Sequence, residues 1–448
     1  MGFKSFLTAA GAVSFMLTAS VTWAEPMDEV LAKIAECNEK GCNQLRLNGI
    51  KGLTFIPEQV LDVVSLDSLD LSRLEITDLS PLAKMPWLKN LNLSGSPVTD
   101  LTPLAGLVAL QDINLSNSKV TDLSPLSGLK ALRELDLRST AVSDLSPIST
   151  LGALTELALS GTPVADLSPL ANLGALEKLD LRKSPATDLS ALASLGGLRE
   201  LSLERAAATD FSPLAGMGAL ERINLSETAI SDLSPLAKLP VLEMLDISKS
   251  AVSDLSPLSE MRKLAVLSAP YTDISDLTPL AKSVNLQILY FYNTKVADLT
   301  PLAGLVNLVN LDISNTGVSD IAALSGAVGM TTLKLEKTTV SDISAVAGMP
   351  ELQTLNINDT NVSDISALKG AATLYTVNLS GTGVTDISAL AGKEKLGSLD
   401  ISGTKISDLG PLSGLPKLRY LTVKDAPNLD KAVLAAMADA GMKIRGLE

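Results

Sequence analysis

One aspartate returns every 22 residues through most of this chain, without insertion or deletion across sixteen repeats. The residues around it return as well: Leu88, Leu91 and Leu93 precede Asp100, and a similar apolar spacing precedes the later aspartates. A short fixed period of this kind predicts a stack whose repeats bury their apolar faces against one another. The aspartates are Asp78, Asp100, Asp122, Asp144, Asp166, Asp188, Asp210, Asp232, Asp254, Asp276, Asp298, Asp320, Asp342, Asp364, Asp386 and Asp408.

The Leu-x-x-Leu-x-Leu spacing inside each repeat is typical of leucine-rich repeats. It predicts an α/β repeat solenoid, an arc with a parallel sheet on its concave side and short helical turns on its convex side. Because side chains alternate along a strand, Leu91 and Leu93 should point into the core, while Asn90 and Asn92 should point outward on the concave face.

The Asp-Leu-Ser-Pro-Leu part of the repeat predicts a capped turn of helix. Ser80 would be the N-cap and Pro81 the first helical residue, where its missing N–H costs nothing. The carboxylate of Asp78 can accept backbone N–H groups of this turn. A row of calcium ligands is the alternative, but the glycine-rich spacing of calcium-binding repeats is missing, so capping is favoured.

Four segments follow from these patterns: a signal peptide (1–24), an N-terminal cap (25–64), an array of about sixteen leucine-rich repeats (65–424) and a C-terminal cap (425–448). Lys4, an apolar run and then Thr22-Trp-Ala24 predict export, to the periplasm or the extracellular space. Helical spacing predicts one helix over 26–39 and another over 427–440. No other stretch approaches 18 consecutive apolar residues, so no membrane-spanning anchor is expected.

Charge and composition exclude several classes of function. The net charge is −14, yet setting the sixteen aspartates aside leaves +2, so the acidity follows from the repeat. No Lys/Arg stripe runs along the stack, which argues against nucleic acid as a partner. The chain has no histidine and no nucleophile-elbow or phosphate-loop motif, so we expect neither an enzyme nor a cofactor.

The only two cysteines, Cys37 and Cys42, lie in the predicted N-terminal cap. In an oxidising compartment their close spacing favours a local disulfide over two free thiols. A metal site is not expected, because two cysteines without any histidine give too few ligands.

The 22-residue unit, with Leu-x-x-Leu-x-Leu followed by Val/Ile-x-Asp-Leu/Ile-Ser-Pro-Leu, resembles the internalin type of bacterial leucine-rich repeat. The resemblance covers about 360 of the 448 residues. It implies an exported protein with a helical N-terminal cap that binds another protein on its concave face. The ninth position departs from the family, which places asparagine there. This chain has hydroxyl residues that can make part of the same bonds, such as Ser96, Thr140 and Thr316.

One region of the predicted concave face breaks the small and polar pattern. The third repeat position is apolar in three successive repeats, at Met244, Val266 and Ile288, and three of the five tyrosines lie beside it, at Tyr271, Tyr290 and Tyr292. Tyrosine clusters and exposed apolar patches are typical of binding hot spots. Alternatively, a degenerate repeat has drifted and the tyrosines cover a packing defect, since Ala269 and Pro270 should disturb the strand there.

A second group of residues is basic, with glutamates among them, and a solvated face of mixed charge is its simpler interpretation. If functional, it would favour an acidic protein or a polysaccharide. The sequence therefore predicts an exported, monomeric binding protein with a protein ligand. A self-associating envelope protein and a carbohydrate-binding module remain as alternatives. The basic residues are Arg138, Arg182, Lys183, Arg199, Arg205 and Arg222.

Overall fold

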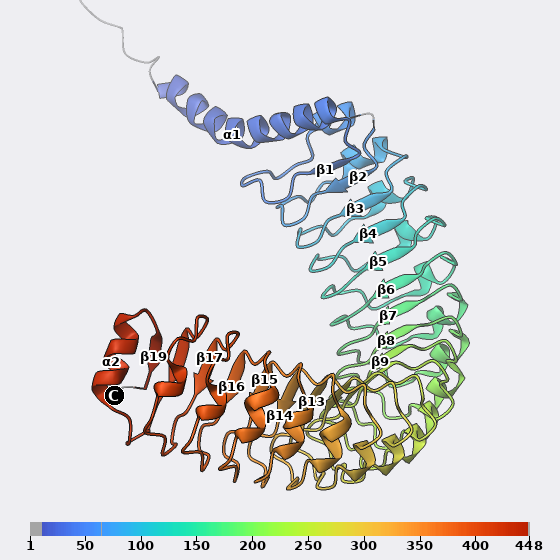
Figure 1. Cartoon of the computed structure of the whole chain (residues 1–448). Coiled ribbons are helices and arrows are strands. Elements are labelled where there is room, and N and C mark those ends of the chain that lie inside the picture. Colours follow the sequence, from blue (N-terminus) through green and yellow to red (C-terminus); the bar gives the residue numbers. More distant parts are fainter. Residues whose placement is uncertain (1–10, 64, 447–448) are drawn as a thin grey trace, which may run out of the picture. The chain divides into compact units, whose positions relative to one another are not determined.

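The computed structural model describes the backbone of residues 11–63 and 65–446, and side chains from Pro26 onward except at 64. Residues 1–10 of the predicted signal peptide, and all its side chains, lie outside this description. The chain divides into an N-terminal half, Met1–Met217, and a C-terminal half, Gly218–Glu448. Each half is a stack of similar repeats (Figure 1).

In the N-terminal half, each strand pairs in parallel with the strand of the next repeat. From β2 to β8 the register advances by 22 residues between neighbours, so equivalent positions of successive repeats stand side by side, while β1 and β2 are offset by 24 residues. The strands are β1 (Gln44–Arg46), β2 (Ser68–Asp70), β3 (Asn90–Asn92), β4 (Asp112–Asn114), β5 (Glu134–Asp136), β6 (Glu156–Ala158), β7 (Lys178–Asp180) and β8 (Glu200–Ser202).

The C-terminal half repeats this parallel pairing from β9 to β19. Its strands are β9 (Arg222–Asn224), β10 (Met244–Asp246), β11 (Val266–Ser268), β12 (Ile288–Tyr290), β13 (Asn310–Asp312), β14 (Thr332–Lys334), β15 (Thr354–Asn356), β16 (Thr376–Asn378), β17 (Ser398–Asp400), β18 (Tyr420–Thr422) and β19 (Lys443–Arg445).

The core of each repeat is a layer of aliphatic side chains. Leu91 is buried between the outward Asn90 and Asn92, as the alternation predicts. Since repeats stack in register, each buried leucine packs on its equivalents above and below, and the apolar area removed from water stabilises the stack. The buried positions of this repeat are Leu88, Leu91, Leu93, Val98, Leu101, Leu104 and Leu107. The predicted α/β repeat solenoid, with parallel strands and short helical turns, is confirmed.

The helical turns are 3-10 helices of three to five residues, from η1 (Glu58–Asp62) to η17 (Gly410–Leu412). The prediction that serine caps them is wrong. In the second of them, η2 (Ser80–Lys84), Ser80 is itself the first residue and its side chain makes no capping bond. The cap is the aspartate, because Oδ1 of Asp78 accepts the backbone N–H of Ser80 at 2.8 Å.

The same bond recurs at all sixteen aspartates, with N–O distances of 2.7 to 2.9 Å. The prediction that these carboxylates accept backbone N–H groups is confirmed. We call this set the aspartate ladder. Its bonds lower the pKa of most of its carboxyl groups; at Asp254 the hydroxyl of Ser256 is the largest cause and the Ser256 N–H the second, while Asp232 opposes weakly.

The hydroxyl residues at the ninth position bond within their own repeat. The side chain of Thr140 donates to the carbonyl of Leu137 at 2.7 Å, and Thr316 donates in the same way to Ile313. Both threonines are buried, so the bond satisfies a hydroxyl that would otherwise be costly in the core. Ser96 instead donates to the carbonyl of Leu71 in the preceding repeat.

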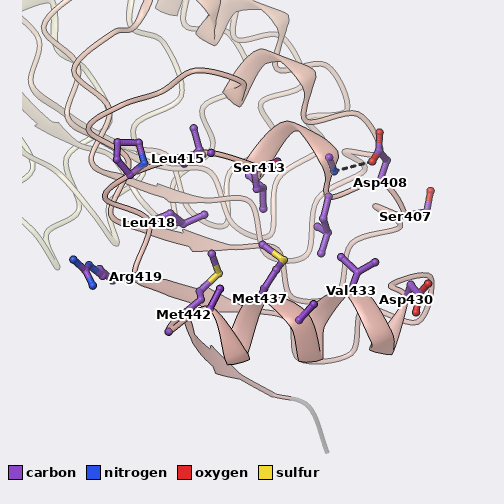
Figure 2. Close-up of a pocket in the computed structure, with 18 residues that line it drawn as sticks. Ser407, Asp408, Ser413, Leu415, Leu418, Arg419, Asp430, Val433, Met437 and Met442 are labelled. Atoms are coloured by element: carbon purple, nitrogen blue, oxygen red, sulfur yellow. Dashed lines mark hydrogen bonds between the residues drawn. The ribbon is translucent and has the colours of Figure 1, made fainter.

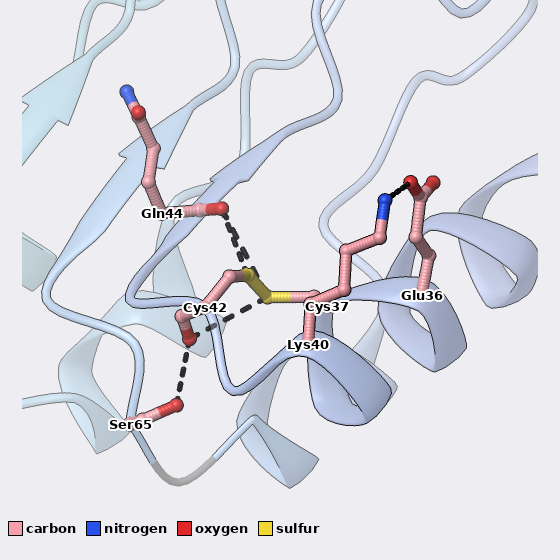
Figure 3. Close-up of a disulfide and its surroundings, with 6 residues drawn as sticks. All are labelled: Glu36, Cys37, Lys40, Cys42, Gln44 and Ser65. Carbon is pink, nitrogen blue, oxygen red and sulfur yellow. Dashed lines mark hydrogen bonds and ion pairs between the residues drawn. A yellow bond between two sulfur atoms is a disulfide. The ribbon is translucent and has the colours of Figure 1, made fainter.

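The predicted N-terminal cap, 25–64, contains the second part of α1 (Gly11–Lys40), β1 and η1. The helix predicted over 26–39 lies inside α1, which begins earlier and ends before Gly41 in a left-handed conformation. Val30 and Ile34 are buried. Cys37 and Cys42 form a disulfide that joins the end of α1 to the chain entering β1 (Figure 3).

The C-terminal cap departs from the prediction in two ways. Its helix α2 (Lys431–Asp439) is shorter than predicted, and Leu434 is its only fully buried residue among those described. A further strand, β19, follows the helix and pairs with β18, which the sequence analysis missed. Among the described residues, no helix is both long and apolar enough to cross a membrane.

The aspartate ladder predicts acid sensitivity. A carboxyl group whose folded pKa lies below its unfolded value contributes stability above the unfolded pKa, and this contribution is lost as the pH falls through the folded pKa. We therefore expect the melting temperature to fall as the pH drops below about 4. Asp254→Ala should lower the melting temperature at pH 7, and the difference from wild type should shrink at pH 2.5.

Asp254→Asn is the matched control, because an amide oxygen can still accept the Ser256 N–H. Its melting temperature at pH 7 should lie between those of wild type and Asp254→Ala. A melting temperature of Asp254→Ala equal to wild type at pH 7 would contradict the capping role.

Candidate functional site

The outward side chains of the strands form a surface that we call the strand face. Each strand presents two outward residues, one on either side of a buried one. The first outward position holds Met244, Val266 and Ile288 in β10, β11 and β12. The second outward position is mostly asparagine or aspartate, as at Asn92 and Asp246.

These asparagines and aspartates are not free binding groups. Oδ1 of Asn92 accepts the backbone N–H of Ser94 at 3.0 Å, so the side chain closes the turn that follows its strand. Ten further repeats make the equivalent bond, at 2.9 to 3.2 Å. We call this set the strand-end row. The alternation of the strand predicts these residues only as outward polar side chains, and their role in the turn was not predicted.

The strand-end row is interrupted at several strands, by Ala158 in β6, Ser202 in β8, Lys334 in β14 and Thr422 in β18, and at the adjacent β11 and β12 by Ser268 and Tyr290. Pro270, two residues after Ser268, has no N–H that would need an acceptor. The interruption at β11 and β12 lies beside Val266 and Ile288. One of the interruptions of the row therefore coincides with the apolar and aromatic part of the strand face.

The six predicted residues lie together in the C-terminal half, and we call them the tyrosine patch. Met244, Val266 and Ile288 stand in register on neighbouring strands, about 5 Å apart by the spacing of a sheet. Met244 and Tyr271 are exposed, while Val266, Ile288, Tyr290 and Tyr292 are half-buried.

Two of the tyrosines contact each other. The rings of Tyr271 and Tyr292 meet edge to face, with centroids 5.5 Å apart and planes at 85°. Burial is the largest cause that raises the pKa of Tyr292, and nearby Tyr271, Asp312 and Asp246 add to it. The phenol of Tyr292 therefore stays protonated at neutral pH and keeps its hydrogen-bond donor.

Tyr271 occupies a left-handed backbone position, with φ of +57°. The equivalent position is left-handed in most repeats and is held there by glycine, asparagine or a long polar residue, such as Gly95, Asn117 and Lys249. This conformation is disfavoured for a bulky side chain. The left-handed position is a feature of the repeat, and at Tyr271 it carries an exposed aromatic ring.

The strand is not disturbed at Ala269 and Pro270, so that prediction is wrong. The N–H of Ala269 donates to Tyr290 at 2.8 Å, and the carbonyl of Pro270 accepts from Lys249 at 2.9 Å. Ala269 is fully buried, and in register with it the next repeat carries the large, fully buried Phe291. A large residue therefore lies next to the small alanine in the core of this region.

Comparison with known proteins identifies the family of these repeats. A family model described as leucine-rich repeats (two copies) matches residues 64–106, 108–150 and 284–326. These three segments of the chain are therefore similar to leucine-rich repeats in sequence. A comparison with curated protein sequences finds no match.

Solved structures share the fold. A leucine-rich repeat protein of Leptospira interrogans is 18% identical over 86% of this chain and 97% of its own, with a TM-score of 0.69. The functional domain of InlJ from Listeria monocytogenes is 19% identical over 81% of this chain and 74% of its own, with a TM-score of 0.54. At 18% and 19% identity these two likenesses show the fold alone.

A third leucine-rich repeat structure is a plant peptide hormone receptor, RGFR1, in complex with RGF2. It is 17% identical over 86% of this chain and 71% of its own, with a TM-score of 0.62. At these identities the likeness shows the fold alone.

Several arginines of the predicted basic patch form ion pairs with acidic residues. Arg138 pairs with Asp136 at 2.6 Å and Arg182 with Asp180 at 2.7 Å, both within their own repeats. Arg205 lies 3.9 Å from Glu204, so a third member of the group also has an acidic neighbour. A solvated face of mixed charge is the interpretation that these pairings favour.

A row of acidic residues was missed by the sequence analysis. Asp112, Glu134 and Glu156 stand side by side on β4, β5 and β6 of the leucine-rich repeat array, with Lys178 bonded to Glu156 at 2.7 Å. Burial is the largest cause that raises the pKa of Asp112 and of Glu134. The signal was readable, because these are the same repeat positions as Met244, Val266 and Ile288. Within the described residues, no group of three or more potential ligands could hold a metal ion.

The tyrosine patch predicts an unusual stability result. Tyr271→Asn loses one exposed ring contact but places at the left-handed position a residue that tolerates it. We expect the free energy of unfolding in urea to stay within about 0.5 kcal/mol of wild type, or to rise. A loss above about 1.5 kcal/mol would instead mean that the ring is part of the core.

Proposed function

We propose that this protein is an exported, monomeric leucine-rich repeat protein that binds a protein ligand through the tyrosine patch. The observation that carries the proposal is the placement of Met244, Val266 and Ile288 in register on three strands, with Tyr271, Tyr290 and Tyr292 beside them. Export rests on the predicted signal peptide, and its destination is the periplasm or the extracellular space.

The composition of the patch suits a protein surface. Aromatic residues and methionine are enriched at the centres of protein interfaces, and tyrosine supplies a large apolar area with a polar end. The patch also lies on a rigid sheet, so little conformational entropy is lost when a partner docks. Binding would bury the half-exposed aliphatic row under the ligand and leave the tyrosine hydroxyls to hydrogen-bond at its edge.

A protein of similar fold also supports a protein or peptide ligand. RGFR1 was solved in complex with RGF2, so its leucine-rich repeat fold carries a peptide ligand. The contribution of this chain would be binding by rigid docking, without chemistry on the ligand.

The experiment compares ligand capture by wild type and by a variant restored to the repeat consensus: Tyr271→Asn, Tyr290→Asn and Tyr292→Ser. Asparagine and serine occupy the equivalent positions of other repeats, for example at Asn92 and Ser94. The variant should therefore fold at least as well as wild type. We expect it to lose a partner captured by wild type from envelope or culture-medium extracts, with affinity reduced about 30-fold or more.

Tyr375→Ala is the matched control, because Tyr375 is exposed but lies outside the patch. It should capture the partner as wild type does. Equal capture by the consensus variant would contradict the proposal. Capture of a glycan, or of a second copy of this chain, would replace it with one of the two alternatives.

A further inference from the structure

The C-terminal cap encloses a pocket that is separate from the tyrosine patch. The pocket has a volume of about 830 Å³ and lies between the last repeat and α2. Figure 2 shows α2 forming one wall, with Met437 near its middle, Val433 toward Asp430, and Leu415 and Leu418 on the opposite wall. This volume falls in the range of about 300–1,000 Å³ typical of small-molecule sites.

The helix presents a continuous apolar stripe to the pocket. Val433, Ala436, Met437 and Ala440 line it, and their spacing of three and four residues places them on one side of α2. Val433 is 43% exposed, whereas Leu434 is 3% exposed. The helix is thus anchored by Leu434 and leaves this apolar stripe uncovered.

The opposite wall is the apolar edge of the last repeat. Leu409, Leu412, Leu415 and Leu418 line the pocket. They are the last leucine layer of the stack, they are 2 to 9% exposed, and α2 lies on the side where a following repeat would stand. Two aliphatic surfaces therefore face each other across the space.

The chain holds α2 at this distance from both ends. Before the helix, the side chain of Asn428 donates to the carbonyl of Lys405 at 3.1 Å. After it, the N–H of Lys443 donates to Arg419 at 2.8 Å and β19 pairs with β18. Because both ends are fixed to the last repeat, the helix cannot move inward without breaking these bonds.

The polar groups of the pocket are divided between its two ends (Figure 2). Asp408 and Asp430 lie at one end, and each already accepts a backbone N–H, from Gly410 and Ala432. Arg419 lies at the other end, beside Met442. In the part of the chain that the structure describes, Arg419 forms no ion pair. The pocket thus combines aliphatic walls with one available guanidinium.

We propose that this pocket binds a fatty acid. The alkyl chain would lie between the stripe of α2 and the leucines of the last repeat, and the carboxylate would bond to the guanidinium of Arg419. Arginine matches a carboxylate with two parallel N–H donors, while burial of the chain between the two walls supplies the apolar contribution. The capped carboxylates at the far end disfavour the reverse orientation.

The test titrates dodecanoate, below its micelle concentration, into the full-length protein and follows the heat of binding. The neutral analogue dodecanol separates the headgroup from the chain. We expect wild type to bind one dodecanoate per molecule, and Arg419→Ala to bind dodecanoate about tenfold more weakly while its affinity for dodecanol is unchanged. Lys417→Ala removes a nearby cation that does not line the pocket, and it should bind as wild type does.

Ala436→Phe fills the space between the walls, and it should abolish binding of both probes without lowering the melting temperature. Absence of a one-to-one complex with wild type would overturn the proposal. So would an unchanged dodecanoate affinity in Arg419→Ala, or binding that persists in folded Ala436→Phe, because either result means adsorption elsewhere. None of these readouts involves the tyrosine patch, so this proposal can fail while the protein-binding proposal stands.

Discussion

The bond from one aspartate carboxylate to the backbone N–H two residues later holds this structure together locally. It recurs in all sixteen repeats at 2.7 to 2.9 Å and caps each 3-10 helix. A 22-residue repeat has few residues available for its turns. One side chain in every repeat must therefore accept the backbone N–H that the turn leaves without a partner. This requirement fixes the period, and the period fixes the register of the strands and the layers of leucine beneath them.

The same chemistry limits where a ligand can be recognised. A second set of asparagines and aspartates closes the turn after many of the strands, and these side chains occupy much of the strand face. Side chains that are needed to close a turn cannot vary freely to fit a partner. The tyrosine patch includes one of the interruptions of this row, at Ser268 and Tyr290, where Pro270 removes the N–H that an acceptor would have served.

Much of the fold could be predicted from the sequence, because it depends on a 22-residue period that is found in all sixteen repeats. The buried leucines, the parallel strands and the capping aspartates all follow from it. The role of serine in the turn was predicted wrongly, since a serine beside an aspartate leaves two candidate caps and only backbone geometry decides between them. β19 was missed because Lys443 to Arg445 contains one apolar residue and lies outside the period.

The candidate site was predictable in part. The apolar row and the tyrosines are visible because they depart from the repeat, and the structure brings them together. The filling of the core by Phe291 beside Ala269 could not be read in advance, because it depends on which residues face each other across two strands. The pocket beneath α2 depends on the distance between this helix and the last repeat. That distance cannot be predicted from a local sequence pattern.

The most direct measurement of the central claim is site-specific photo-crosslinking in the presence of the natural extract. A photoreactive phenylalanine analogue would replace Ile288 in one protein and Thr376 in another, since both occupy the first outward position of their strands. The account predicts a covalent adduct with a protein ligand from the probe at 288 and none from the probe at 376. An adduct from 376 alone, or equal adducts from both, would place recognition outside the tyrosine patch.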